Sequence, residues 1–170
     1  MKNLTAIIKF LTSNTHEKLG KILIEKSLQI STAESCTGGL LSSRLTDVSG
    51  SSAYTKANFV TYSNESKSTI LGVSEEIIKK YGAVSEQCAY EMAAGLVKKT
   101  KCDIAVCTTG IAGPTGGTKE KPVGLIYISV AFKGEIIVKQ FQLSSEYNRR
   151  NMKFMFTEKA LELVLEIIQP

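Results

Sequence analysis

The sequence predicts a single-domain layered α/β/α sandwich built on a mixed, mostly parallel β-sheet. Short apolar runs typical of strands alternate along the chain with longer segments of helical periodicity, an order typical of α/β proteins. Residues 103–109, DIAVCTT, form a near-continuous apolar run, as strands do in a sheet covered on both faces. Two strand-like runs separated by Lys133-Gly134 predict a hairpin, which makes the sheet mixed.

The first part of the chain supplies helices around one strand. Apolar residues recur at helical spacing in residues 6–11 and 19–23, and the polar residues 13–15 between them predict a helix cap. Residues 27–33, SLQISTA, predict a strand. GGLLSSRLTDV, from Gly38 onward, predicts the helix that follows.

The rest of the chain adds the remaining elements of the sandwich. NFVTYS, residues 58–63, predicts a strand that is followed by a polar loop, NESK. Ser74 and Ser85 predict the caps of a short helix and a longer one. VGLIYISVAF and EIIVKQFQL predict the two hairpin strands, and the apolar positions from Met152 to Ile168 predict a final helix.

Length and composition limit the class of protein. The chain has 170 residues, of which 43% are hydrophobic and 22% charged, which fits one domain over residues 1–170 and excludes disordered or collagen-like proteins. The net charge of +5 is dispersed, and no basic stripe is interleaved with aromatic residues, so a nucleic-acid partner is disfavoured. We expect a homo-oligomer, because small enzymes commonly form one.

The cysteines and the apolar runs indicate the compartment. The four cysteines show neither a CxxC pair nor a secreted framework, so we expect reduced, mostly buried thiols without a metal or a disulfide. No apolar run approaches the ~18 residues of a membrane span, and the N-terminus lacks a signal-peptide cleavage site. We therefore expect a cytoplasmic protein with no membrane partner.

Three predicted strands end in polar segments: TAESCTGG (residues 32–39), TYSNESK (61–67) and TTGIAGPTGG (108–117). In open α/β sheets, ligands bind beyond the carboxyl ends of the strands, so we expect these segments to form one site. Gly38 and Gly39 would let backbone N–H groups approach an anion at a helix N-terminus. A tight turn with a Ser or Thr cap is the alternative interpretation of the same sequence. The third segment fits an anion-binding loop or a long turn, since it lacks the order of a P-loop.

The first segment offers three candidate nucleophiles in a row, Ser35, Cys36 and Thr37, and a nucleophile needs a base. The single histidine, His16, is predicted on a surface helix, which leaves a carboxylate or a lysine. Lys67 can accept a proton if burial favours its neutral form, and serine–lysine pairs are an established variant of serine-hydrolase chemistry. The alternative is a solvated charge in a polar loop. The residues alone indicate a small-molecule α/β enzyme of hydrolytic type.

Taken together, the motifs resemble those of the CinA C-terminal domain family, whose characterised members are nicotinamide-nucleotide amidohydrolases. The matching pieces are TAESCTGG, GSSAY, FVTYSNESK, LGV, YGAVSE, TGIAGPTGG and KPVG. They occur in family order and with family-like spacing over roughly residues 30–130, and the ordered set is highly specific. The chain looks like the stand-alone form, without the large N-terminal domain that many family members carry.

The resemblance implies a reaction and the residues that perform it. Ser35 would be the nucleophile and Lys67 its base, and Tyr62 and Thr109 would bind or position the substrate. The reaction is hydrolysis of nicotinamide mononucleotide, through an acyl-enzyme, to nicotinic acid mononucleotide and ammonia, a step of pyridine nucleotide salvage. It requires no metal and no organic cofactor.

The resemblance also implies two sites for negative charge. Arg149, in the stretch EYNRRN, would contact the substrate phosphate, and the adjacent Arg150 is the alternative. Backbone N–H groups from Cys36 to Gly39, including that of Gly38, are the expected donors to the oxyanion of the reaction.

Two rival interpretations remain from the sequence. The first is an interaction module connected with competence or DNA damage, with little or no amidase activity; retention of Ser35, Tyr62, Lys67 and Thr109 together argues against it. The second is a cysteine amidase that uses Cys36, which has no obvious histidine partner and should point away from the side of Ser35.

Overall fold

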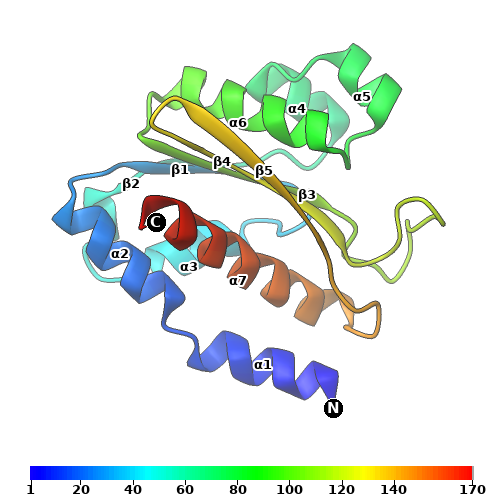
Figure 1. Cartoon of the computed structure of the whole chain (residues 1–170), viewed down its shortest axis with the longest axis horizontal. Helices are drawn as coiled ribbons and strands as arrows, with labels where there is room; N and C mark the ends of the chain where they lie inside the picture. The colour runs from blue at the N-terminus through cyan, green and yellow to red at the C-terminus, as the bar shows by residue number, and fades with distance from the viewer. Residues whose placement is uncertain (170) are drawn as a thin grey trace.

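A five-stranded β-sheet separates two layers of helices in the computed structural model, which describes residues 1–169 (Figure 1). The strands lie in the order β2-β1-β3-β4-β5. Their bounds are Ile30–Glu34 for β1, Thr55–Val60 for β2, Ile104–Gly110 for β3, Leu125–Phe132 for β4 and Glu135–Gln142 for β5. β1 is parallel to β2 and β3, whereas β4 is antiparallel to β3 and β5, so four strands share one direction. The predicted mixed, mostly parallel sheet is confirmed.

The helices divide between the two faces of the sheet (Figure 1). On one side lie α2 (Thr15–Glu25), α3 (Leu40–Thr46) and α7 (Arg149–Ile168), with α1 (Lys2–Thr12) packed on α7. On the other side lie α4 (Asn64–Leu71), α5 (Glu75–Tyr81) and α6 (Glu86–Thr100). A short 3-10 turn, Ser51–Ala53, precedes β2. No helix of residues 1–169 is long and apolar enough to cross a membrane.

The core consists of two hydrophobic clusters, one on each face of the sheet. Successive residues of a strand point to opposite faces, so Ile104 and Val106 of β3 enter the cluster with α2, α3 and α7. Ala105 and Cys107 enter the cluster with α6 instead. Burial on both faces explains why this strand is apolar at nearly every position. The expected burial of the four cysteines is confirmed.

Two predictions about local structure are wrong. The NESK segment, expected as a loop, begins α4, because the Ser63 hydroxyl caps the helix by accepting the N–H of Ser66 at 3.0 Å. His16, expected on the surface, is only 7% exposed, because α2 packs its inner face against α7. The predicted cap at Ser85 is confirmed by its bond from the N–H of Cys88. Ser74 precedes α5 as predicted, but its side chain makes no cap bond.

The start of α7 is fixed by α1. The side-chain oxygen of Asn3 accepts the N–H of Asn148 and the side-chain amide of Asn151, both at 2.9 Å. Asn148 itself caps α7 by accepting the N–H of Asn151. The first turn of α7 is therefore held from two directions, and this turn carries Arg149.

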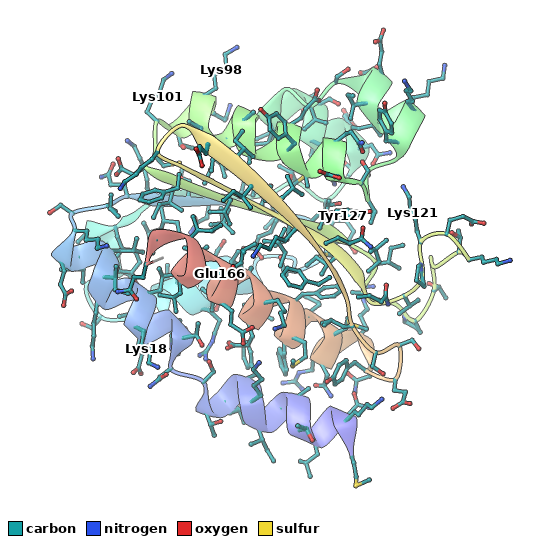
Figure 2. The ribbon with its side chains drawn as sticks, viewed as in Figure 1. Lys18, Lys98, Lys101, Lys121, Tyr127 and Glu166 are labelled. Carbon is teal, nitrogen blue, oxygen red and sulfur yellow. The ribbon has the colours of Figure 1, made fainter. Side chains whose placement is uncertain are left out.

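Positive charge is dispersed over the surface. Lys18 on α2 and Lys98 on α6 project outward from different parts of the molecule (Figure 2), whereas the amine of Lys121, in the loop before β4, donates to the carbonyl oxygen of Tyr81. This distribution agrees with the absence of a basic stripe in the sequence.

Candidate active site

A hollow of about 280 Å³ lies beyond the carboxyl ends of β1 and β3. Residues of all three polar segments line it, together with the start of α7. Those that matter for the chemistry are Ser35, Tyr62, Lys67, Thr109 and Arg149. The expected convergence of the three strand ends is present, as the topology of an open α/β sheet requires.

Lys67 and Ser35 are in direct contact at the base of this hollow. The Lys67 Nζ lies 3.1 Å from the Ser35 Oγ, 2.9 Å from the carbonyl oxygen of Thr61 and 3.3 Å from that of Tyr62. The lysine is only 1% exposed, and no ion pair within residues 1–169 includes it. Burial lowers the pKa of Lys67, although the Cys88 and Cys36 thiols act weakly in the opposite sense.

These contacts match the bonding capacity of a neutral amine. A neutral lysine has two N–H donors and one lone pair, whereas an ammonium has three donors and no acceptor. With two donors directed to the carbonyls of Thr61 and Tyr62, a neutral amine would direct its lone pair toward Ser35, whereas an ammonium would direct its third donor there. The site can therefore hold an unprotonated lysine with every position filled.

The local fold explains why Lys67 is buried. It lies on the buried face of α4, one turn after the Ser63 cap, and its side chain extends toward Ser35 at the end of β1. α6 approaches the end of α4 closely at Gly95, where an added Cβ would lie 1.8 Å from the carbonyl oxygen of Leu71. Only glycine permits this approach, which packs α6 tightly against the helix that carries Lys67.

Glu34 is a residue of the site that sequence reasoning missed. Its carboxylate is fully buried and accepts the N–H groups of Gly39 at 2.9 Å, Leu41 at 3.0 Å and Ser42 at 2.8 Å, and the hydroxyl of Ser42 as well. The helix N-terminus thus binds an anion, as its sequence suggested, but the anion is the chain's own glutamate. The signal in the sequence was a carboxylate placed directly before Ser35 and close to the paired glycines.

This arrangement corrects the expected role of the two glycines. The N–H of Gly39 serves Glu34, and the N–H of Gly38 donates to the carbonyl oxygen of Ser35 at 3.1 Å, so neither is free for a substrate. In the described chain, the N–H groups of Cys36 and Thr37 have no acceptor. They are the remaining donors next to Ser35.

β3 holds the loop that carries Ser35 and forms part of the wall of the hollow. The carbonyl oxygen of Thr108 accepts the N–H of Ser35 at 3.0 Å, and the hydroxyls of Thr108 and Thr37 lie 2.8 Å apart. The next residue, Thr109, lines the hollow and donates its hydroxyl proton to the carbonyl of Ala83 at 2.7 Å. Because that proton is committed, the Thr109 oxygen can only accept hydrogen bonds from a ligand.

Arg149 crosses the mouth of the hollow. Its guanidinium donates to the carbonyl oxygen of Gly113 and to the hydroxyl of Tyr62, both at 2.7 Å, and so connects the glycine loop to the TYSN segment. Tyr62 is 57% exposed. Arg150 does not line the hollow, and its guanidinium stacks on the ring of Phe154 instead. Of the two arginines, Arg149 is the one at the site.

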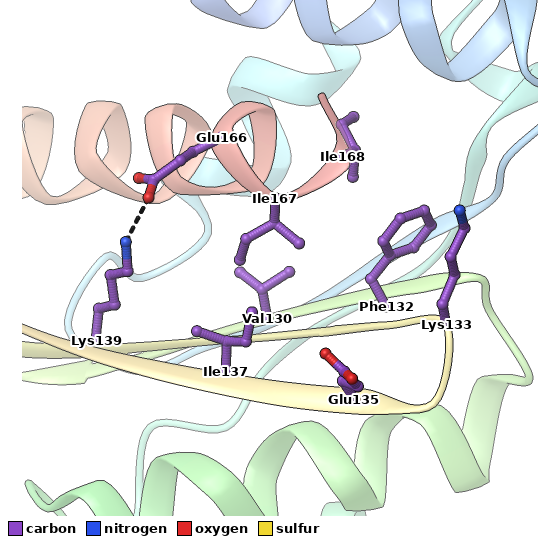
Figure 3. A pocket seen from close by; sticks show the side chains of 9 residues that line it. All are labelled: Val130, Phe132, Lys133, Glu135, Ile137, Lys139, Glu166, Ile167 and Ile168. Carbon is purple, nitrogen blue, oxygen red and sulfur yellow. Dashed lines mark hydrogen bonds and ion pairs between the residues drawn. The ribbon is translucent and has the colours of Figure 1, made fainter. Parts of the chain in front are cut away.

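A larger hollow of about 500 Å³ lies at the other end of the strands, between the β4-β5 hairpin and the C-terminal end of α7 (Figure 3). Its walls combine apolar side chains with four charged ones, of which Lys139 and Glu166 form an ion pair (Figure 3). No serine or cysteine lines it. Among the described residues, no group of His, Cys, Asp or Glu side chains is arranged to hold a metal ion. The reactive groups therefore gather in the smaller hollow.

The fold and site define an α/β protein in which a half-buried serine contacts a buried lysine at the carboxyl ends of the parallel strands. The chain belongs to the CinA C-terminal domain family, which matches residues 12–168. It is 51% identical over 154 residues to a CinA-like protein of Chloroherpeton thalassium, covering 89% of this chain and 37% of that one. A putative competence-damage inducible protein of Clostridium novyi is 51% identical over 78% of this chain and 32% of its own length. The chain spans about a third of the length of these curated relatives.

Solved structures agree with the family. The competence/damage inducible protein CihA of Agrobacterium tumefaciens superposes with a TM-score of 0.89 at 37% identity, covering 92% of this chain and 94% of its own. A competence-damaged protein (CinA) superfamily member of Escherichia coli gives a TM-score of 0.86 at 32% identity, over 91% and 88% of the two chains. The fold and the family are therefore shared, and the reaction is a separate question.

The Glu34 contacts predict a measurable effect on stability. Glu34→Gln places an amide where the carboxylate accepts backbone N–H groups, so at least one buried donor loses its acceptor. The free energy of unfolding should fall by about 1–3 kcal/mol, the usual penalty for an unsatisfied buried group. Urea denaturation measures it. Glu65→Gln, an exposed carboxylate in the first turn of α4, is the control and should change stability by about 0.5 kcal/mol or less. Equal effects would mean that Glu34 does not anchor the loop.

Proposed function

We propose that this domain hydrolyses the carboxamide of nicotinamide mononucleotide, giving nicotinic acid mononucleotide and ammonia, with Ser35 as nucleophile and Lys67 as base. The observation that carries the proposal is the 3.1 Å contact between Ser35 Oγ and a buried lysine that has no acidic partner within the described chain. The substrate comes from the resemblance to characterised members of the family. The step would serve pyridine nucleotide salvage.

In the first step, the lone pair of neutral Lys67 accepts the hydroxyl proton of Ser35 while Oγ bonds to the carboxamide carbon. The carbonyl π electrons move onto oxygen, and the N–H groups of Cys36 and Thr37 are the proposed donors to that oxyanion. The carbonyls of Thr61 and Tyr62 keep the amine oriented throughout. Proximity and orientation are thus set before the substrate arrives.

In the second step, the tetrahedral intermediate collapses. The Lys67 ammonium gives its proton to the departing nitrogen, ammonia leaves, and the acyl group remains as an ester of Ser35. Water then attacks the ester with Lys67 again as base, and the carboxylate product and the Ser35 hydroxyl are released. Thr109, which can only accept, suits the N–H of a carboxamide and not the oxygen of a carboxylate.

The mouth of the hollow suits a phosphorylated substrate. Arg149 presents a planar fork that matches a phosphate group, and contacts to Gly113 and Tyr62 hold it in place. A ligand phosphate would replace one of these contacts; the exposed Tyr62 is the more mobile partner.

The rival functions fit less well. Burial raises the pKa of the Cys36 thiol to about 12, so it is not a thiolate at neutral pH, and no histidine lines the hollow. The names of the relatives refer to competence and damage induction, which favours an interaction module. A binding surface, however, has no use for an amine buried against a serine. The free cysteines fit a reducing compartment, and we propose the cytoplasm as the location.

Substitution of the two adjacent side chains separates the serine from the cysteine mechanism. Ser35→Ala should abolish ammonia release from nicotinamide mononucleotide, because it removes the attacking oxygen. Cys36→Ala should keep most of the activity, because only its backbone N–H takes part. Ammonia release by purified protein, with circular dichroism to verify the fold, is the measurement. Comparable losses in both folded variants would remove the assignment of Ser35.

Substitution of Lys67 distinguishes a base from a fixed positive charge. Lys67→Arg should be nearly as inactive as Lys67→Ala, since a guanidinium keeps its proton. In the wild-type enzyme, kcat/KM should rise with pH through an acid limb whose pKa is that of Lys67, below the ~10.4 of a free lysine. Substantial activity in Lys67→Arg, or an unchanged acid limb in a slow Lys67 variant, would assign the deprotonation of Ser35 to another group.

A further inference from the structure

The contacts of Lys67 fit both of its protonation states. Its Nζ lies 2.9 Å from the carbonyl oxygen of Thr61, 3.3 Å from that of Tyr62 and 3.1 Å from the Ser35 Oγ. An ammonium would donate to all three oxygens, whereas a neutral amine would donate to the two carbonyls and accept the serine proton. Only the second state can act as a base. The charges around the amine therefore decide whether the site is active.

The groups around Lys67 supply no free negative charge. Besides burial, which lowers its pKa, the titratable groups that act on Lys67 are the thiols of Cys88 on α6 and Cys36 beside the serine. Burial raises the pKa of the Cys88 thiol to about 11 and that of Cys36 to about 12, so both are uncharged at neutral pH. The Glu34 carboxylate is buried against the N–H groups that it accepts. Arg149, the other charged residue that lines the hollow, is a cation.

The hollow therefore offers no counter-charge to a cation that enters it. Within residues 1–169, no aspartate or glutamate lines it. The Tyr62 hydroxyl accepts a guanidinium proton from Arg149 at the mouth, and part of the wall is apolar, including Ile111 and Ala112. A positive charge carried in by a ligand would act on Lys67 without local compensation, and with less screening than in water.

We propose that the substrate activates its own base: the positive charge of its pyridinium ring drives Lys67 into the neutral form that can accept the Ser35 proton. The proposal rests on the proposed function, and it gives a task to a part of the substrate that does not react. The ring nitrogen of nicotinamide mononucleotide is bonded to ribose, which makes the ring a cation. The Ser35 Oγ lies 3.1 Å from the amine, so a ring whose carboxamide carbon Oγ attacks lies within about 4–6 Å of Lys67, the range at which a like charge disfavours an ammonium. The ammonium proton leaves to solvent as the ligand binds.

The same ring charge acts during the reaction. It attracts the oxyanion that forms on the adjacent carboxamide. Once Lys67 has taken the serine proton, the ring lies beside a like charge, which makes the ammonium a stronger acid toward the departing nitrogen. The class of substrate that follows is the N-substituted pyridinium carboxamides. A neutral carboxamide, such as free nicotinamide, would meet more enzyme in which Lys67 is protonated.

Nicotinamide mononucleotide and benzamide ribotide form a matched pair of ligands for the test. Benzamide ribotide has the same carboxamide, ribose and phosphate, but its ring is a neutral benzene joined through carbon. The acid limb of kcat reports the base in the enzyme–substrate complex. Its midpoint with nicotinamide mononucleotide should lie about 1–3 pH units below its midpoint with benzamide ribotide, whatever the two maximal rates. Coincident midpoints would overturn the proposal.

Calorimetry measures the same effect without turnover. Ser35→Ala is titrated with each ligand in buffers of different ionisation enthalpy, which gives the number of protons released on binding. At a pH between the midpoints of the two complexes, nicotinamide mononucleotide should release about one proton more than benzamide ribotide, because the shared phosphate contributes equally. The excess should disappear when Lys67→Met is added. It should persist when Lys98→Met, a change of an exposed lysine on α6, is added instead.

The outcomes separate this inference from the reaction itself. If the wild-type protein releases ammonia but the two ligands release equal numbers of protons, the proposal is overturned and the proposed function stands. If the wild-type protein releases no ammonia, the proposed function fails and the calorimetry still decides. An excess that depends on Lys67 then supports the effect of the ring charge, and equal release or no binding overturns it.

Discussion

The desolvated contact between Lys67 and Ser35 is the constraint on which the rest of the site depends. Burial without a carboxylate shifts an amine toward its neutral form, and in that form two backbone carbonyls would leave the lone pair of Lys67 for the serine, as the proposed mechanism requires. Burial lowers the pKa of Lys67 in the folded chain below its value in the unfolded chain. At a pH between these two values the unfolded chain binds more protons than the folded one, so the free energy of unfolding rises with pH across that window. The Ser63 cap fixes the start of the helix that carries Lys67, and the close approach at Gly95 packs the end of that helix against α6.

A second buried residue, Glu34, shapes the loop between β1 and α3, which carries Ser35. Its carboxylate gathers the N–H groups at the start of α3, so the chain between β1 and α3 turns tightly around it. That turn exposes the Ser35 side chain and leaves the N–H groups of Cys36 and Thr37 without partners. The buried Glu34 carboxylate thus fixes a loop conformation in which two N–H groups remain available to the oxyanion of the proposed reaction.

The sequence predicted most of the fold, because periodicity and buried apolar runs depend on neighbours along the chain. It also predicted that three strand ends converge, since that follows from α/β topology. It did not predict α4, whose first residues are polar and whose signal is a single serine cap. The role of Glu34 was missed because its partners, backbone N–H groups and the Ser42 hydroxyl, come together only when the chain folds. The burial of His16 likewise follows from tertiary packing of α2 on α7.

The most direct test of the account is the titration of the Lys67 amine itself. NMR of protein carrying labelled lysine side chains follows each amine with pH, and the signal missing from Lys67→Met identifies the one of interest. The account predicts that this amine loses its proton below the ~10.4 of an ordinary lysine, and that it still does so in Ser35→Ala, since burial is the cause. A Lys67 that titrates together with the exposed lysines would contradict a neutral base next to Ser35.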